Sequence, residues 1–256
     1  MSELRIGTSG WSYASWRGPF FPKDVRIKDH LAFYATRFNT TELNAPFYRT
    51  PTPEAVKGWF ENTPDDFVFA WKASRFITHW KRLTETCENS IALMEDRLRP
   101  LMHKAGPILF QLPPGMHANR ERLARFFKLL RKRRPYVFEF RHPSWYEPPI
   151  LDVLRDHDAA LCLSDHSDAP APWEVTASFV YVRGHGPTGR YHSHYPDATL
   201  QAWARDIKKW RRQRRDVYCF FDNDQKSAAP RDAERLQLFL RGRAVKPEAR
   251  AQQEAA

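Results

Sequence analysis

Short apolar runs that end in polar residues recur along this chain, and most of them precede a run with helical spacing. The first is LRIGTS at 4–9, which is followed by KDHLAFYATRF at 28–38. Short apolar runs bounded by turn residues indicate buried strands, whereas apolar recurrence every three to four residues indicates amphipathic helices. We predict eight strands from this pattern, at 4–9, 39–44, 67–72, 107–112, 136–141, 159–164, 178–183 and 216–221.

Helical runs separate these strands and are expected at 28–38, 53–63, 87–105, 119–134, 148–158, 197–215 and 230–242. Alternation of strand and helix implies a parallel sheet, because each crossover returns the chain to the same edge. Eight such units close naturally into a (β/α)8 TIM barrel, and this single-domain α/β fold is our prediction. The proline-rich segment after the sixth strand has no obvious helix, so one outer helix is expected to be degenerate or replaced by a loop.

A doubly wound open sheet is the main alternative to a barrel. A dinucleotide-binding sheet would carry GxGxxG after its first strand, but GTSGW at 7–11 has too few glycines at the wrong spacing. We expect the barrel domain to span residues 1–242. Residues 243–256 lack an apolar face and are expected to form a disordered tail.

Composition limits the class and the compartment of the protein. The chain has 256 residues, 42% of them hydrophobic, which suits the core of one α/β barrel. Its start, MSELRIGTSG, has no apolar stretch behind a basic segment, and no run approaches the ~20 apolar residues of a membrane span, so we expect neither a signal peptide nor a membrane segment. Buried, reduced thiols are the simplest interpretation of Cys162 and Cys219, and we expect a cytoplasmic location.

The formal net charge of +11 raises the expectation of an anionic partner. The two densest basic runs, RKRR at 131–134 and KKWRRQRR at 208–215, fall in the C-terminal halves of predicted helices. These helix ends point away from the C-terminal mouth of a barrel, and basic side chains there complement the helix dipole. Nucleic acid is therefore a less favoured partner than a small anionic ligand, and no membrane partner is expected.

The polar ends of the strands supply the candidate site. Side chains alternate along a strand, so Phe138 and Phe140 share the outer face while Glu139 and Arg141 face the barrel axis. The C-terminal strand ends of a barrel are where catalysis is found. Applied to each strand, this argument predicts one polar mouth lined by Glu42, Asn44, Lys72, Gln111, Glu139, Arg141, Asp165, Arg183 and His185. A plug of structural ion pairs is the alternative, but buried charges cost several kcal/mol each unless they are well paired.

Roles follow from the chemistry of these side chains. Glu42 and Glu139 are the candidate acid and base, because two carboxylates in unlike environments can divide those roles. His185, which titrates near neutrality or serves as a hydrogen-bonding residue, joins Asp165 as a further catalytic candidate. The cations of the mouth suit a phosphate or carboxylate. The expected substrate-binding residues are Asn44, Lys72, Arg75, Gln111, Arg141, Arg183, Trp11, Tyr48 and Asn223.

No metal ligand and no cofactor is predicted. The HSH segment at 192–194 is a lone HxH in a loop, which is a weak signal for a metal. P-loop, HExxH and GxSxG motifs do not occur in the sequence.

Seven motifs in a fixed order resemble those of the YecE-like family, domain of unknown function 72: GTSGWSY, ELNAPFYRTP, FVFAWKASRFITH, ILFQLPPG, FEFRHPSW, RGHG and FFDND. The resemblance extends to about Gly242. It implies a TIM barrel and no established reaction. ELNAPFY departs from the usual ExNxTFY of the family and FFDND from FNND, but both retain the polar residues of interest, Glu42, Asn44, Asn223 and Asp224.

Three classes of function fit these observations. The first is an enzyme, of hydrolase, lyase or isomerase type, that acts on a small anionic substrate by acid–base chemistry. The second is a metal-dependent endonuclease-like or nucleic-acid-binding barrel, suggested by analogy of fold alone. The third is a non-catalytic ligand-binding protein. We favour the first, because the cations of the mouth would repel a metal and attract an anion.

Overall fold

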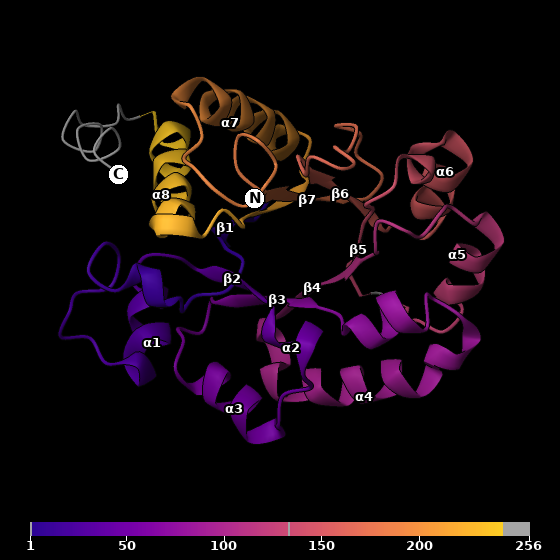
Figure 1. The fold of residues 1–256 in the computed structure, drawn as a ribbon, viewed down its shortest axis with the longest axis horizontal. Helices are drawn as coiled ribbons and strands as arrows, with labels where there is room; N and C mark the ends of the chain where they lie inside the picture. The colour runs from indigo at the N-terminus through magenta and orange to yellow at the C-terminus, as the bar shows by residue number, and fades with distance from the viewer. Residues whose placement is uncertain (1, 133, 243–256) are drawn as a thin grey trace.

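Eight parallel strands with helices packed around them form the molecule (Figure 1), which a computed structural model describes for residues 2–132 and 134–242. The strands are β1 (Leu4–Thr8), β2 (Thr40–Leu43), β3 (Val68–Lys72), β4 (Ala105–Gln111), β5 (Tyr136–Glu139), β6 (Ala160–Ser164), β7 (Phe179–Gly184) and β8 (Asp216–Phe221). All eight predicted strands are confirmed, with ends that differ by one or two residues. The tail expected at 243–256 lies outside the described residues.

The sheet closes almost completely on itself. Its strand order is β1-β8-β7-β6-β5-β4-β3-β2, and every neighbouring pair is parallel. The remaining seam, between β1 and β2, is joined by a bridge between Ser9 and Glu42 and by a hydrogen bond of 2.8 Å from the Gly10 amide to the Glu42 carbonyl. The predicted TIM barrel is therefore confirmed, and the open doubly wound sheet is excluded.

The helices are α1 (His30–Ala35), α2 (Ala45–Tyr48), α3 (Pro53–Glu61), α4 (Glu88–Leu98), α5 (Arg120–Phe127), α6 (Pro148–Asp156), α7 (Asp197–Arg212) and α8 (Ala228–Leu240). Caps define several starts, since the Thr52 side chain accepts from the Ala55 amide and the Asn119 side chain from the Arg122 amide. Residues 165–178, all of them described, contain no helix, which confirms the missing outer helix.

The predicted helix at 119–134 is wrong in its second half. Helix α5 ends at Phe127, and the described basic residues that follow, Arg131, Lys132 and Arg134, lie in the loop before β5. Arg131 and Arg134 reach from this loop to Glu95 of α4, with nitrogen–oxygen distances of 3.7 and 3.1 Å. These tertiary ion pairs hold the basic side chains in a loop that local helical spacing did not reveal.

Two apolar layers follow from the alternation of strand side chains. Outward residues such as Trp71 and Phe138 pack against the helices, whereas Val137, Cys162 and Tyr181 fill the barrel interior. This confirms the predicted faces of β3 and β5. The interior is apolar at depth, so the polar residues at the strand ends form a separate layer above it.

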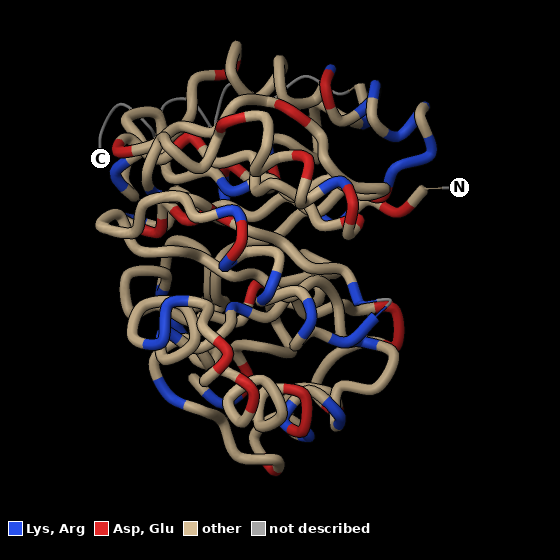
Figure 2. Tube along the Cα trace, turned by 90° about the vertical axis from the view of Figure 1, so that its right-hand side faces the viewer, with Lys and Arg blue, Asp and Glu red and all other residues tan. Residues whose placement is uncertain are grey.

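Basic residues gather at the N-terminal end of the strands, opposite the mouth. Lys208, Arg211 and Arg214 line a hollow with Asp216, the first residue of β8. Arg211 also donates a hydrogen bond to the Ser2 carbonyl, and Figure 2 shows basic residues close to the N-terminus. The prediction that this charge lies away from the mouth is therefore confirmed for the run at 208–215.

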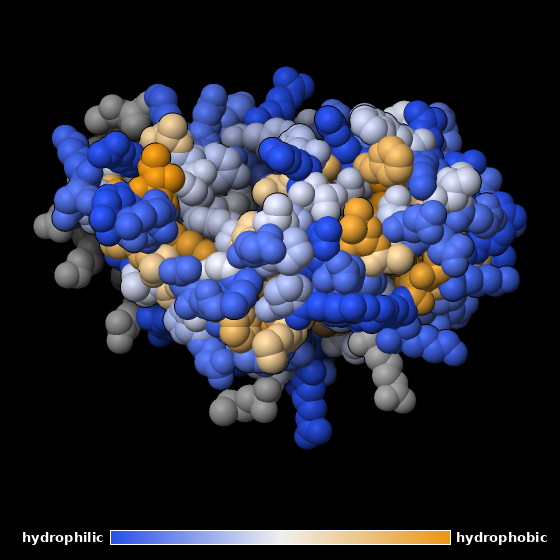
Figure 3. All heavy atoms as spheres, turned by 90° about the horizontal axis from the view of Figure 1, so that it is seen from below, coloured by the Kyte–Doolittle hydropathy of each residue, from blue (hydrophilic) through white to orange (hydrophobic). Residues whose placement is uncertain are grey.

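The face of the molecule seen from below in Figure 3 is largely hydrophilic. The face in Figure 3 carries separate small apolar patches among polar residues. No helix in the described part of the chain is long and apolar enough to cross a bilayer.

Candidate functional site

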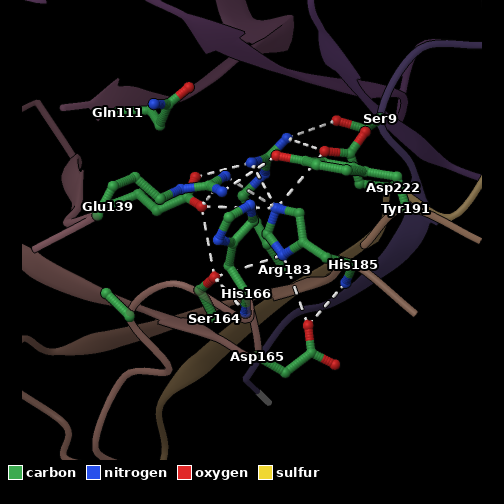
Figure 4. A network of polar contacts seen from close by, with 12 residues as sticks. Ser9, Gln111, Glu139, Ser164, Asp165, His166, Arg183, His185, Tyr191 and Asp222 are labelled. Atoms are coloured by element: carbon green, nitrogen blue, oxygen red, sulfur yellow. Dashed lines mark hydrogen bonds and ion pairs between the residues drawn. The ribbon is translucent and has the colours of Figure 1, made fainter. Parts of the chain in front are cut away.

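Buried polar side chains from six strand ends meet at the C-terminal end of the barrel (Figure 4). We call this cluster the mouth network, and its members are Ser9, Glu42, Glu139, Arg141, Ser164, Arg183, His185 and Asp222. Each residue stands on or just after a strand, so the parallel barrel brings all of them to one end. The predicted convergence of polar strand ends is therefore what the structure shows.

Arg183 is the centre of the mouth network and is fully buried. Its guanidinium donates to Glu139 Oε2 at 2.7 Å, to Glu42 Oε1 at 2.8 Å and to Asp222 Oδ2 at 2.8 Å, and Ser9 Oγ accepts at 2.9 Å. Burial acts to lower the pKa of Arg183, but the three carboxylates outweigh it and raise the pKa well above its usual value. Arg183 therefore stays charged and joins the ends of four other strands, β1, β2, β5 and β8.

Glu139 is held between two guanidinium groups. Its Oε1 lies 2.5 Å from Arg141 Nη2, and Ser164 Oγ donates to the same oxygen at 3.3 Å. Burial acts to raise the pKa of Glu139, but Arg141 and Arg183 outweigh burial and lower the pKa below its usual range. Glu139 is therefore ionised at neutral pH and is poorly suited to donate a proton there.

Glu42 is also bound through both of its oxygens. Oε1 accepts from Arg183 and Ser9, and Oε2 accepts from the Tyr181 hydroxyl at 2.6 Å. Tyr181 lies inside the barrel directly below the mouth network. Glu42 therefore ties the network to the apolar interior of the barrel.

His185 accepts hydrogen bonds from both arginines. Its Nε2 lies 3.1 Å from Arg141 Nη2 and 3.1 Å from Arg183 Nη1, so this nitrogen acts as an acceptor. Its backbone amide donates to Asp165 Oδ1 at 2.7 Å, while the Tyr195 hydroxyl donates to Asp165 Oδ2. Asp165 therefore fixes the chain after β7, and His185 orients the two guanidinium groups.

Lys72 ends β3 and differs from the other buried charges of the mouth. It is only 8% exposed, yet no described residue forms a hydrogen bond or an ion pair with its Nζ. The ammonium lies 4.5 Å from the centre of the Phe47 ring. Burial first, and then Arg183, lower the pKa of Lys72.

Arg75 and Arg141 join Lys72 in what we call the cationic wall (Lys72, Arg75 and Arg141). Arg75 lies between the rings of Tyr48 and Trp80, at 5.9 and 5.5 Å from their centres. The neighbouring His79 is affected by these charges. Burial first, and then the three cations, lower the pKa of His79 to about 4. The space beside His79 is therefore positive and favours an anion.

Asp224 follows β8, and its pKa is shifted in the opposite direction from that of Glu139. Burial first, and then the neighbouring carboxylate of Asp222, raise the pKa of Asp224 to about 8, while Arg183 and Tyr13 partly oppose the shift. The Tyr13 hydroxyl donates to the Ser9 carbonyl at 2.5 Å, which holds the loop after β1 against this end of the barrel. A carboxyl with this pKa exchanges its proton near neutral pH.

Four predicted substrate-binding residues belong neither to the mouth network nor to the cationic wall. Gln111 bonds the adjacent Leu112 carbonyl and stands apart in Figure 4. Trp11 packs edge-on against Trp59 of α3, and Tyr48 is exposed at the rim. Asn223 is buried, but its amide donates to Asp232 of α8 and to the Ser193 carbonyl, so the structure turns it away from the mouth. Asn44 does join the network, through a 3.0 Å bond to Ser9 Oγ.

Sequence reasoning missed Ser9, His79, Asp222 and Asp224 as site residues. Asp222 and Asp224 lie in the FFDND motif and His79 in FITH, so the motifs contained a signal for them. Nothing in the alternation pattern marks Ser9, which matters only because Arg183 and Glu42 reach it from other strands.

Arg183 also occupies the place where a cation would lie among the carboxylates. In residues 2–132 and 134–242, no group of three or more His, Cys, Asp and Glu side chains is arranged to hold a metal ion. His194 of the HSH segment instead pairs with Asp232, at 3.1 Å.

The barrel and its polar mouth define a TIM-barrel protein with a candidate site at the C-terminal strand ends. Residues 5–255 match the family described as "Protein of unknown function DUF72", and the chain belongs to this family. The resemblance seen in its motifs is therefore confirmed.

Two curated relatives carry names that state no reaction. The chain is 26% identical over 253 residues to the UPF0759 protein YunF of Bacillus subtilis, which covers 86% of this chain and 89% of that protein. It is 33% identical over 146 residues to the UPF0759 protein YecE of Escherichia coli K12, which covers 56% of this chain and 50% of that protein.

Solved structures of the family share the fold. A DUF72 family protein of Thermotoga maritima, TM1631, superimposes with a TM-score of 0.83 at 25% identity, over 93% of this chain and 99% of that one. EF0366 of Enterococcus faecalis gives a TM-score of 0.78 at 21% identity, over 95% and 97% of the two chains.

Proposed function

We propose that the barrel mouth binds a small phosphate- or carboxylate-bearing compound and transforms it by acid–base chemistry. The observation that carries this proposal is Lys72, a nearly buried ammonium with no anionic contact among the described residues. A buried charge without a partner is costly, and an anionic ligand would remove that cost. Arg75, on the rim, adds a second cation with planar donors.

This proposal assigns the acid–base role to Asp224, in place of the two glutamates that the sequence suggested. Glu42 and Glu139 are bound to Arg183 on both sides of its guanidinium, so they position the cations instead of exchanging protons. Asp224 has a pKa of about 8 and shares Arg183, Asp222 and Glu42 as electrostatic neighbours with Lys72. Substrate held at Lys72 would therefore lie over the same network that Asp224 borders.

His79, Asp165 and His185 have supporting roles in this scheme. His79 is neutral at neutral pH, because its pKa is about 4, and its Nδ1 lies 2.8 Å from Thr78 Oγ1. Asp165 holds the backbone at His185, and His185 orients the arginines of the mouth network. These rigid contacts preorganise the charges that a developing anion would meet.

A small ligand fits the site better than nucleic acid as a partner. The basic run at 208–215 lies beside the start of β8, at the end of the barrel opposite to the mouth. The three cysteines are free and buried, which fits the cytoplasmic location that we expect.

Anion binding can be tested with inorganic phosphate and oxalate as probes. Both are expected to raise the melting temperature of the wild type at constant ionic strength, and Lys72→Met should weaken the apparent affinity by at least about tenfold. Arg26→Gln, which breaks an exposed ion pair with Asp29, is the matched control and should bind like the wild type. Equal stabilisation of wild type and Lys72→Met would place the anion elsewhere and end the proposal.

Asp224→Asn tests the proposed proton donor through stability. The native pKa of about 8 lies above the unfolded value of 3.8, so the native state holds a proton that the unfolded state loses. Wild-type stability should therefore fall as pH rises from about 4 to about 8, and Asp224→Asn should lack this component. Urea unfolding across this range measures it, with the exposed Asp152→Asn as the control. Parallel pH profiles for wild type and Asp224→Asn would refute the raised pKa.

A further inference from the structure

We propose that Lys72 is a nucleophile that forms an imine with its ligand, so the mouth takes aldehydes or ketones that also carry a phosphate or carboxylate. This inference rests on the proposed function for the anionic group and adds the carbonyl group. It names both a covalent step and a substrate class for the site.

A second buried lysine, Lys104, has a structural role and serves as a comparison for Lys72. Lys104 is 3% exposed and lies over the Phe60 ring at 4.2 Å. Its Nζ donates to the Phe60 carbonyl at 2.7 Å, to the Thr63 carbonyl at 2.8 Å and to Thr63 Oγ1 at 3.2 Å. These three acceptors saturate an ammonium. Lys72 is also buried, at 8% exposure, and has a similar ring contact, but it has none of these acceptors among the described residues.

The environment of Lys72 makes the neutral amine more accessible than in a free lysine. Burial desolvates the ammonium and Arg183 repels it, and these effects outweigh the carboxylates of Asp222, Glu42 and Glu139, so the pKa of Lys72 is lowered. A desolvated lysine beside another cation is a recognised way to activate an amine for attack on a carbonyl. Phe47 lies beneath Lys72 and also packs edge-on against His79, which keeps this part of the mouth apolar on one side.

The charge of the mouth network suits an iminium ion. Three carboxylates, Glu42, Glu139 and Asp222, surround two guanidinium groups, Arg141 and Arg183, which leaves one negative charge in excess. The ammonium of Lys72 balances this charge, and a protonated imine at the same nitrogen keeps the balance after the amine has reacted. The network is therefore preorganised to stabilise the product of the step.

The step balances without an oxidant or reductant. The neutral Lys72 nitrogen attacks the carbonyl carbon, a carbon–nitrogen bond forms, and a proton passes through water from the nitrogen to the oxygen, which gives a neutral carbinolamine. A second proton, taken from solvent, lets the hydroxyl leave as water while the carbon–nitrogen double bond forms. One neutral amine, one carbonyl and one proton thus give one iminium ion and one water. The resulting iminium draws electrons from the adjacent carbon and acidifies its proton.

Borohydride trapping tests the inference on the wild-type protein. The probes are pyridoxal 5′-phosphate, which carries an aldehyde and a phosphate, and pyruvate, which carries a ketone and a carboxylate. After reduction, peptide mass mapping should locate the adduct on Lys72, with labelling at least about tenfold faster than on Lys104. Inorganic phosphate in excess should slow the labelling of Lys72. Label spread over exposed lysines, with Lys72 unmodified, would overturn the proposal.

Two variants add an independent check. Lys72→Arg should lose the adduct but keep stabilisation by inorganic phosphate, whereas Lys104→Arg should keep the adduct at Lys72. If a variant fails to fold, peptide mass mapping of the wild-type protein still shows whether Lys72 forms the adduct. Stabilisation by phosphate that depends on Lys72, without any adduct there, would overturn the imine and leave the anion site standing. An adduct on Lys72 that phosphate neither slows nor competes with would instead overturn the anion site.

Discussion

Replacing Arg183 with methionine is expected to destabilise the fold by about 3–5 kcal/mol, because removal of one partner leaves buried charges uncompensated. Methionine fills much of the space of the arginine stem but leaves Glu42, Glu139 and Asp222 without their common cation. Two of these carboxylates are fully buried, so water cannot replace the guanidinium. Urea unfolding at neutral pH measures the loss.

The pH dependence of Arg183→Met gives a second readout. Arg183 is one of the groups that lower the pKa of Glu139 against the effect of burial, so its loss moves this pKa upward. The native variant then binds a proton more readily than the native wild type, and the stability deficit of the variant should shrink as the solution is acidified. Arg26→Gln, with its partner Asp29 at the surface, should unfold like the wild type. If Arg183→Met were as stable as the wild type, the buried carboxylates would not depend on the guanidinium for their stabilisation.

Glu139→Gln is expected to cost about 3 kcal/mol, because a neutral amide cannot serve Arg141 and Arg183 together. The sign of its pH dependence follows from the lowered pKa of Glu139. The stabilisation by Glu139 is fully present above the unfolded pKa and is lost as pH falls through the lower native pKa. The gap in unfolding free energy between wild type and variant should therefore narrow on acidification.

This variant also separates two roles for Glu139. A positioning residue loses stability when its charge is removed, whereas an acid or base at the same place would lose turnover with the fold intact. Chemical unfolding of Glu139→Gln beside Glu147→Gln, an exposed glutamate before α6, provides the comparison. A Glu139→Gln protein as stable as the wild type would return Glu139 to the list of acid–base candidates.

The sequence by itself determined the barrel and the orientation of its strand side chains. Eight apolar runs separated by helical runs specify parallel strands, and backbone geometry sends alternate side chains to opposite faces. Glu42, Glu139 and Arg183 could therefore be assigned to the barrel axis from local pattern alone. The structure agrees because both properties depend on residues that are close in the chain.

Only the tertiary structure decided which charges meet and which remain without a partner. Arg183 binds Glu42 and Glu139, which lie 141 and 44 positions away in the sequence. The contact between Arg183 and Glu139 lowers the pKa of Glu139 and raises that of Arg183. Lys72 faces the same mouth but receives no such contact among the described residues. Asn223 turns to α8, and Asp224 becomes partly buried near Asp222. The energy of a buried charge depends on groups within a few ångströms in space, and local alternation indicates only the face on which that charge lies.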